Sequence, residues 1–243
     1  MLTPGGTTHR KTLRWQTARV LAIRDETPTA KTFRLALPEP RVHLAGQYYV
    51  LRLTAPDGYS TSRSYSVASA PSDDGEIELT VERLEGGEVS EFLHDVVEPG
   101  DMLDVRGPVG LFFAWRGEAP VLLVGGGSGV VPLMAMLRHA RRTGRSDLVR
   151  LVVSARSPAD LYYADELPGP ETTVAYTRAA PAGGRPVGRL SVDDVRPLVR
   201  GREEREEVYV CGSPAFADAA TELLLASGVL VDSIRVERFG PSG

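Results

Sequence analysis

A glycine-rich turn near the middle of the chain constrains its fold more than any other feature. Residues 121–124 form a continuous apolar run, residues 125–129 read Gly-Gly-Gly-Ser-Gly, and residues 130–142 have the pattern of a helix. A continuous apolar run is typical of a strand buried on both faces, as in a parallel sheet. Glycines let the backbone turn sharply and approach a ligand, and the N-terminus of the next helix attracts a phosphate. The segment therefore predicts a strand, a phosphate-binding turn and a helix, with an ordinary tight turn as the alternative.

The rest of the C-terminal half repeats this alternation of strand and helix. Strands are predicted at residues 148–155, 173–177, 208–211 and 234–237, and helices at residues 192–200 and 215–227. Such alternation implies a parallel sheet with helices on both faces. The charged run Glu-Glu-Arg-Glu-Glu at residues 203–207 predicts a solvated loop before a strand.

The N-terminal half has a different pattern, in which turn residues separate short strands. The predicted strands are residues 19–24, 32–37, 47–53, 76–81 and 102–106. Short strands with regular turns and little helix favour a small antiparallel barrel. The one helix expected here covers residues 90–97, with Ser90 as its N-cap.

The change of pattern between residues 108 and 120 divides the chain. We expect a flexible tail at residues 1–14, an antiparallel barrel domain at residues 15–115 and an α/β domain at residues 116–243. The chain of 243 residues is long enough for both domains to bury a core. The tail has no apolar core, so we expect neither a signal peptide nor a membrane span.

Composition argues against several classes of protein and site. The formal net charge of -4 disfavours a nucleic-acid-binding protein, which is usually basic. Cys211 is the single cysteine, and an iron–sulfur cluster takes four thiolates, so a redox centre within the chain has to be an organic cofactor. The spacing of the four histidines matches no metal site, and no metal is expected. The lack of disulfides is compatible with the reducing cytoplasm, where we expect the protein to reside.

Two segments of the N-terminal half carry groups that suit a phosphate or an aromatic ligand. In Arg63-Ser64-Tyr65-Ser66, the arginine can hold a phosphate, the tyrosine ring can stack, and Ser66 can hydrogen-bond a heteroaromatic edge. Taken alone, these residues are more typical of a surface arginine, a half-buried strand tyrosine and a turn serine. Gly87-Glu88-Val89-Ser90 precedes the predicted short helix and is a second candidate phosphate site, with an ordinary N-cap as an equal alternative.

Cys211-Gly212-Ser213-Pro214 ends a predicted strand of the parallel sheet. Ligands bind at the carboxyl ends of the strands in open α/β sheets, so Cys211 is expected to face a ligand. The alternative is a small buried hydrophobic residue, which free cysteine often is. A nucleophilic role is not supported, because no histidine or aspartate constellation accompanies the cysteine.

Taken in order, these motifs resemble those of the ferredoxin–NADP reductase superfamily. The resemblance extends from Trp15 to Gly240. It rests on six segments, which are Arg63-Ser64-Tyr65-Ser66, Gly87 to Ser90, Gly107-Pro108-Val109-Gly110, Gly125 to Gly129, Cys211-Gly212-Ser213-Pro214 and Glu237-Arg238-Phe239-Gly240. It implies a β barrel plus an α/β unit, in which an antiparallel flavin-binding barrel is followed by a parallel-sheet nicotinamide-nucleotide domain.

The resemblance implies flavin contacts in the barrel. Arg63 would bind a flavin phosphate, Tyr65 would stack on the flavin, and Ser66 would lie near flavin N5, the atom that receives the hydride. The implied flavin-binding set is Arg63, Ser64, Tyr65, Ser66, Gly87, Val89 and Ser90. Because the second phosphate site around Ser90 is intact, FAD is favoured over FMN.

The resemblance also implies nucleotide contacts in the C-terminal half. The glycine-rich turn would hold the pyrophosphate of NAD(P)H, Cys211 would lie beside the nicotinamide, and Phe239 matches an aromatic residue that covers the flavin. Here four residues follow Phe239. The implied nucleotide-site residues are Gly125, Gly126, Gly127, Ser128, Gly129, Arg156, Thr177, Arg178, Cys211, Gly212 and Phe239. The implied catalytic residues are Tyr65, Ser66 and Cys211.

The preference between the two nicotinamide nucleotides rests on Thr177 and Arg178. In relatives that use NADPH, a hydroxyl residue followed by arginine holds the 2′-phosphate, for which arginine has the geometry. Arg156 would assist. The resemblance therefore favours NADPH slightly over NADH.

The function that the resemblance implies is that of a flavin-dependent oxidoreductase. It would transfer a hydride from NAD(P)H to bound FAD and pass electrons to a separate acceptor, an iron–sulfur or other redox protein, since the chain has no cysteine-rich ferredoxin segment. Two alternatives remain open. One is a reductase of small acceptors such as free flavin or ferric chelates, and the other is a non-catalytic electron-transfer or nucleotide-sensing subunit.

Overall fold

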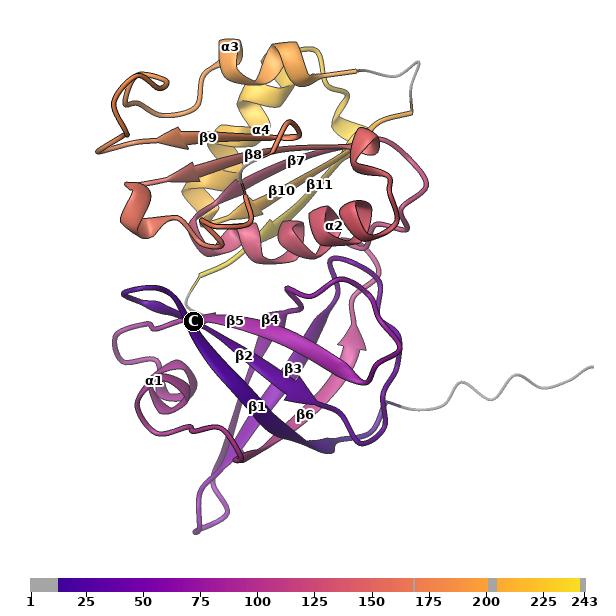
Figure 1. Cartoon of the computed structure of the whole chain (residues 1–243), viewed down its shortest axis with the longest axis vertical. Coiled ribbons are helices and arrows are strands. Elements are labelled where there is room, and N and C mark those ends of the chain that lie inside the picture. Colours follow the sequence, from indigo (N-terminus) through magenta and orange to yellow (C-terminus); the bar gives the residue numbers. More distant parts are fainter. Residues whose placement is uncertain (1–12, 168, 201–204, 241–243) are drawn as a thin grey trace, which may run out of the picture.

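A computed structural model describes residues 13–167, 169–200 and 205–240. Residues 1–12 of the tail expected at residues 1–14 lie outside the described residues. Figure 1 shows a barrel stacked against an α/β unit. The strands are β1 (Gln16–Thr27), β2 (Ala30–Ala36), β3 (Tyr48–Thr54), β4 (Ser60–Ser66), β5 (Glu76–Glu82), β6 (Met102–Val109), β7 (Val121–Gly126), β8 (Val149–Ala155), β9 (Thr172–Tyr176), β10 (Glu207–Gly212) and β11 (Ile234–Arg238). The helices are α1 (Glu88–Asp95), α2 (Val130–Arg142), α3 (Val192–Val195) and α4 (Pro214–Ala226). None of these described helices is long and apolar enough to cross a membrane.

The barrel is a six-stranded sheet with the order β4-β3-β6-β1-β2-β5, in which neighbouring strands pair antiparallel. A bridge between Val67, just after β4, and Leu79 of β5 brings the two edge strands together. Side chains alternate across the sheet, and Tyr49 and Leu51 of β3 are buried in the barrel core. α1 packs Leu93 on the same core. The antiparallel barrel predicted from the sequence is confirmed.

The C-terminal half forms a five-stranded parallel sheet with the order β11-β10-β7-β8-β9. Its central strand β7 begins with the apolar residues 121–124, and all four side chains are buried because helices cover both faces. α2 lies on the face toward the barrel, and α3 and α4 lie on the opposite face (Figure 1). The predicted parallel sheet is confirmed, and α2 has the bounds expected for the helix after the glycine-rich turn.

The expected start of the short helix in the barrel half is wrong. α1 begins at Glu88 with Gly87 as its N-cap, two residues earlier than predicted, and no side chain caps it. Ser90 lies within the first turn, where its hydroxyl donates to the Gly87 carbonyl (3.0 Å). The hydroxyl therefore tightens the loop before the helix and does not cap the helix.

Two further expectations in the C-terminal half are wrong. The helix predicted at residues 192–200 ends at Val195 and continues as a 3₁₀ turn, because Pro197 cannot donate a helical hydrogen bond. Within the charged run, Glu206 is buried and pairs with Arg150, so this carboxylate does not lie in a solvated loop. Residues 203 and 204 lie outside the described residues.

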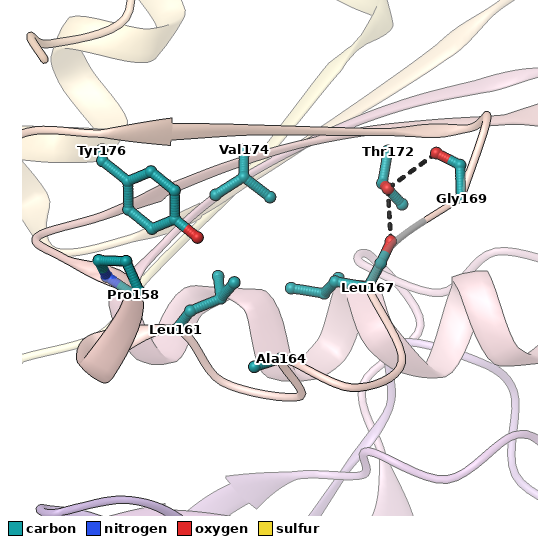
Figure 2. Close-up of a pocket in the computed structure, with 8 residues that line it drawn as sticks. All are labelled: Pro158, Leu161, Ala164, Leu167, Gly169, Thr172, Val174 and Tyr176. Atoms are coloured by element: carbon teal, nitrogen blue, oxygen red, sulfur yellow. Dashed lines mark hydrogen bonds between the residues drawn. The ribbon is translucent and has the colours of Figure 1, made fainter. Parts of the chain in front are cut away.

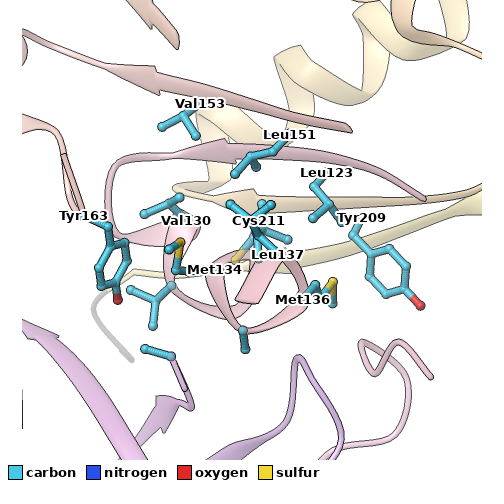
Figure 3. Packing of buried hydrophobic residues seen from close by; sticks show 14 of the residues in the cluster. Leu123, Val130, Met134, Met136, Leu137, Leu151, Val153, Tyr163, Tyr209 and Cys211 are labelled. Carbon is cyan, nitrogen blue, oxygen red and sulfur yellow. The ribbon is translucent and has the colours of Figure 1, made fainter. Parts of the chain in front are cut away.

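One of the hydrophobic clusters contains residues of both the barrel and the α/β unit. α2 lies between the two units, and its side chains Met134 and Leu137 belong to this cluster (Figure 3). The cluster also contains Trp115 from the segment that links the two units. Arg138 on α2 then reaches the barrel, where it donates to the Glu78 carboxylate at 2.7 Å. Buried side chains pack closely and resist rearrangement, so this cluster and the Arg138–Glu78 contact favour one orientation of the two units.

Candidate functional site

A cleft of about 870 Å³ separates the barrel from the carboxyl edge of the parallel sheet. It opens where β7, β8 and β9 end, the usual position of a ligand in open α/β sheets. Among the predicted cofactor-site residues, those that line the cleft are Arg63, Ser64, Tyr65, Ser66, Gly87, Val89, Ser90, Gly126, Gly127, Ser128, Arg156, Thr177 and Phe239. Those that do not line it are Gly125, Gly129, Arg178, Cys211 and Gly212.

β4 supplies much of the barrel wall of the cleft. Tyr65 packs partly against the barrel core, and burial raises the pKa of its hydroxyl to about 12, so the side chain stays neutral. Arg63 is exposed, and its Nη1 atom donates to the Ser62 carbonyl (2.8 Å) and the Thr61 hydroxyl (3.4 Å). Arg63 has no ion pair with any described residue, which leaves its guanidinium free to meet an anionic ligand.

The loop before α1 forms the next part of the barrel wall. The Ser90 side chain is buried there, and its hydroxyl accepts a hydrogen bond from the Leu84 amide (3.2 Å). A Cβ at Gly87 would lie 2.5 Å from the Ser90 oxygen, so this compact loop requires glycine. Because Ser90 is occupied in holding the loop, the groups left for a phosphate are the backbone amides of the first turn of α1.

The residues of the glycine-rich turn divide into two groups. Gly126, Gly127 and Ser128 line the cleft, and Gly127 has a φ of 54°, in the left-handed region that favours glycine. Gly129 packs away from the cleft, where a Cβ would lie 2.1 Å from the carbonyl oxygen of Cys211. Glycine at this position lets α2 begin directly against β10. The start of α2 and its free amides are thereby held at the cleft.

Cys211 does not face the cleft, contrary to the expectation from the sequence. Its side chain is fully buried in the core between the parallel sheet and α2, in the same cluster as Val130, Met134 and Leu137 (Figure 3). Burial raises the pKa of the thiol well above its usual value, so Cys211 stays neutral and unreactive. Cys211 is therefore a small buried hydrophobic residue, which was the alternative prediction from the sequence.

The structure brings together only part of the predicted 2′-phosphate site. Arg156 follows β8 and Thr177 follows β9, and both line the cleft. Arg178 does not line it, and the Arg178 amide donates to the Arg156 carbonyl at 2.9 Å. Because Arg156 lines the cleft and Arg178 does not, Arg156 is better placed than Arg178 to meet a phosphate.

The end of β11 also lines the cleft. The Phe239 amide donates to the Gly212 carbonyl at 2.8 Å, which holds Phe239 at the cleft. Glu237 lines the same wall, beside Cys211 in the register of the sheet. Burial raises the pKa of the Glu237 carboxyl to about 7. Glu237 is not among the predicted site residues. The sequence feature that could have indicated it is its position, since it is an acidic residue at the carboxyl end of a predicted parallel strand.

A second, smaller hollow lies beside β9 (Figure 2). It has a volume of about 450 Å³, and the side chains of Leu161 and Leu167 face Val174 of β9 across it. The Thr172 hydroxyl donates to the Leu167 carbonyl and so ties the segment after β8 to β9. None of the predicted site residues lines this hollow, and none of its described lining residues is charged, so it offers no phosphate site.

Sequence models of two families match the two halves of the chain. The oxidoreductase FAD-binding domain matches residues 17–113, and the oxidoreductase NAD-binding domain matches residues 123–222. The propane 2-monooxygenase reductase component of Gordonia sp. (strain TY-5) is 30% identical over a span that covers 92% of this chain and 67% of that protein. The chain belongs to the ferredoxin–NADP reductase superfamily.

Further members of the superfamily are similar over the same span. The propane 2-monooxygenase reductase component of Rhodococcus jostii (strain RHA1) is 35% identical over 91% of this chain, which spans 62% of that protein's length. The crystal structure of the flavohem-like FAD/NAD-binding domain of nitric oxide dioxygenase from Vibrio cholerae matches with a TM-score of 0.80 and 26% identity. That match covers 93% of this chain and 99% of the Vibrio domain, so the two units are arranged alike in both.

The two family matches identify FAD and a nicotinamide nucleotide as the cofactors of this superfamily member. The residues of the cleft fit both. Arg63 on the barrel wall and Arg156 on the sheet wall lack carboxylate partners among the described residues, as phosphate-binding arginines do. Each wall also presents the start of a helix, α1 or α2, to the same cleft.

Proposed function

We propose that the chain is an NAD(P)H-dependent flavoprotein reductase, which takes a hydride from NAD(P)H and passes electrons to a separate acceptor. One observation carries the proposal: the barrel wall with Arg63 and Tyr65 faces the glycine-rich turn across a single cleft. A flavin held on one wall and a nicotinamide held on the other would meet between them. Relatives named as reductase components of monooxygenases support the same activity.

The residues of the cleft would act by positioning, since hydride transfer needs no protein base. Arg63 would hold a flavin phosphate, and Tyr65 would support the ring with a neutral surface. Ser66 is buried at the end of β4 and would hydrogen-bond the ring edge. Phe239 would exclude water from the centre of the cleft. Bound FAD supplies the hydride acceptor.

The acceptor that we propose is a separate redox protein, an iron–sulfur protein or an oxygenase component. The relatives' names support this choice, because each describes a reductase component of a monooxygenase. Cys211 is the one cysteine of the sequence, so the chain itself cannot supply the four thiolates of a cluster. A cytoplasmic location remains a prediction from the sequence.

The direct test is an absorption spectrum of the purified protein, followed by anaerobic addition of NADPH and, separately, NADH. We expect a flavin spectrum that one or both nucleotides bleach. Bleaching followed by recovery on addition of a redox protein would support the full proposal. A protein that oxidises NAD(P)H only when free flavin is added would instead be a reductase of small acceptors. A protein that binds neither FAD nor FMN would overturn the proposal.

Tyr65→Ala is expected to weaken FAD retention by about tenfold or more, because stacking on an aromatic ring contributes about 1–3 kcal/mol. Tyr65→Phe keeps the ring and loses only the hydroxyl, so it is expected to retain FAD. FAD content after gel filtration and the flavin spectrum of each variant measure the effect. Unchanged FAD content and spectrum in Tyr65→Ala would remove Tyr65 from the site.

Arg156→Ala is expected to raise the KM for NADPH by about tenfold or more and to leave the KM for NADH nearly unchanged, since a charge-assisted hydrogen bond contributes about 1.5–3 kcal/mol. Arg178→Ala is also expected to raise the KM for NADPH, but by less, because Arg178 does not line the cleft. Steady-state kinetics with an artificial acceptor measure both. Equal changes for the two nucleotides would exclude these arginines from a 2′-phosphate site.

A further inference from the structure

The hydroxyl of Tyr162 is buried without a partner. The Tyr162 side chain lines the cleft but is only 5% exposed, and its hydroxyl has no hydrogen-bond partner among the described residues. Such a hydroxyl has lost its bonds to water without replacing them, which destabilises the fold. Native proteins rarely keep an unsatisfied buried group without a functional reason.

The neighbouring residue shows what a structural tyrosine does in the same place. The Tyr163 hydroxyl bonds the Thr80 hydroxyl at 2.5 Å, and Thr80 bonds Thr32 at 2.6 Å, so that Tyr163 links the α/β unit to the barrel. The ring centroids of Tyr162 and Tyr163 are 6.3 Å apart. Tyr162 therefore lies at the same junction between the two units. Its ring packs in the cluster that joins them, but its hydroxyl forms none of the hydrogen bonds that link them.

Tyr162 shares the cleft with a carboxylate from the barrel. Burial raises the pKa of the Tyr162 hydroxyl, and the negative charge of nearby Glu82 raises it further. The phenol thus stays protonated and can donate a hydrogen bond, whereas the carboxylate of Glu82 accepts. A donor and an acceptor that line the same cleft match the two hydroxyls of a ribose, and a carboxylate is a common partner of a nucleotide ribose.

We propose that Tyr162 and Glu82 bind the ribose next to the nicotinamide of NAD(P)H, an inference that rests on the reductase function proposed above. The position of Glu82 distinguishes this ribose from the adenosine ribose. Glu82 belongs to β5 of the barrel, and the nicotinamide half of the nucleotide is the part that has to reach the barrel to meet the flavin. The adenosine half is expected at the sheet edge, where Arg156 and Thr177 lie.

Tyr162→Phe separates the contact with the ligand from the stability of the fold. The variant keeps the ring and removes a hydroxyl that has no partner in the free protein, so the Tm of the nucleotide-free protein is expected to stay the same or rise. The Kd for the oxidised nucleotide is expected to increase about five- to tenfold. Glu82→Gln keeps the shape of the side chain and is expected to weaken binding in the same direction.

Two controls accompany this variant. Tyr163→Phe removes a hydroxyl that has a hydrogen-bond partner, so it is expected to lower the Tm, whereas Tyr162→Phe is not. Adenosine diphosphate lacks the nicotinamide ribose, so its Kd is expected to be the same for the wild type and Tyr162→Phe. Each Kd is measured by calorimetric titration of the flavin-containing protein with NAD⁺, NADP⁺ or adenosine diphosphate.

The possible results lead to different conclusions. Weaker binding of adenosine diphosphate in Tyr162→Phe would place the contact on the adenosine ribose and overturn the assignment. Loss of FAD with unchanged nucleotide affinity would assign the hydroxyl to the flavin, and unchanged affinity for every ligand would make Tyr162 purely structural. Bleaching of the wild-type flavin by NAD(P)H, measured first, shows independently whether the reductase function holds.

Discussion

Gly129→Ala is expected to weaken binding of the nicotinamide nucleotide by about 100-fold and to lower the free energy of unfolding by about 1–3 kcal/mol. The alanine Cβ would lie 2.1 Å from the carbonyl oxygen and 2.4 Å from the carbonyl carbon of Cys211. Both atoms are backbone atoms of β10 and cannot rotate away, so α2 and β10 must separate. That separation displaces the first turn of α2, which we propose holds the pyrophosphate.

Gly144→Ala provides the matched control. Gly144 lies in the turn after α2, away from the cleft, with a φ of 70° and no atom within 4 Å of its Cβ position. Alanine in this conformation costs about 1–2 kcal/mol, but the start of α2 stays in place. Urea unfolding and nucleotide titration of both variants separate stability from affinity. Wild-type affinity in Gly129→Ala would show that the glycine-rich turn does not position the nucleotide.

Much of the fold could be predicted from the sequence because the signals that specify it are local. The apolar run of β7, the glycines after it and the helix pattern of α2 lie within 22 consecutive residues, Val121 to Arg142. β4 shows where such signals fail. Its sequence is Ser-Thr-Ser-Arg-Ser-Tyr-Ser, and most of it lines the cleft, so it lacks the apolar alternation of a strand.

The side-chain environments of the site could be predicted less well, because they depend on segments that are distant in the sequence. The direction of the Cys211 side chain depends on where α2 crosses β10, and α2 buries it. The burial of Glu206 depends on Arg150 in β8. The burial of the segment around Tyr162 depends on the barrel, which its neighbour Tyr163 contacts through Glu26 and Thr80, and no local pattern reveals this.

Glu237→Gln is expected to stabilise the free protein by about 1–3 kcal/mol at pH 8 and to have little effect near pH 4. Burial raises the pKa of this carboxyl from 4.5 to about 7. Between these values the folded protein holds a proton that the unfolded chain releases, so the free energy of unfolding falls as the pH rises through this window. Above pH 7 the wild-type protein carries an ionised carboxylate that is partly shielded from water, and this destabilises the fold. Glutamine avoids that loss because it carries no charge.

Urea unfolding of the wild type and Glu237→Gln at a series of pH values from 4 to 8 tests this expectation. The difference between the two proteins should grow from near zero to its full size as the pH rises to about 7. Glu222→Gln on the exposed side of α4 should differ from the wild type by less than about 0.5 kcal/mol throughout. A gain in Glu237→Gln that is the same at every pH would mean that the gain comes from packing and that the Glu237 carboxyl titrates normally. A gain confined to high pH would show that the wall of the cleft carries a carboxyl poised to change charge near neutral pH.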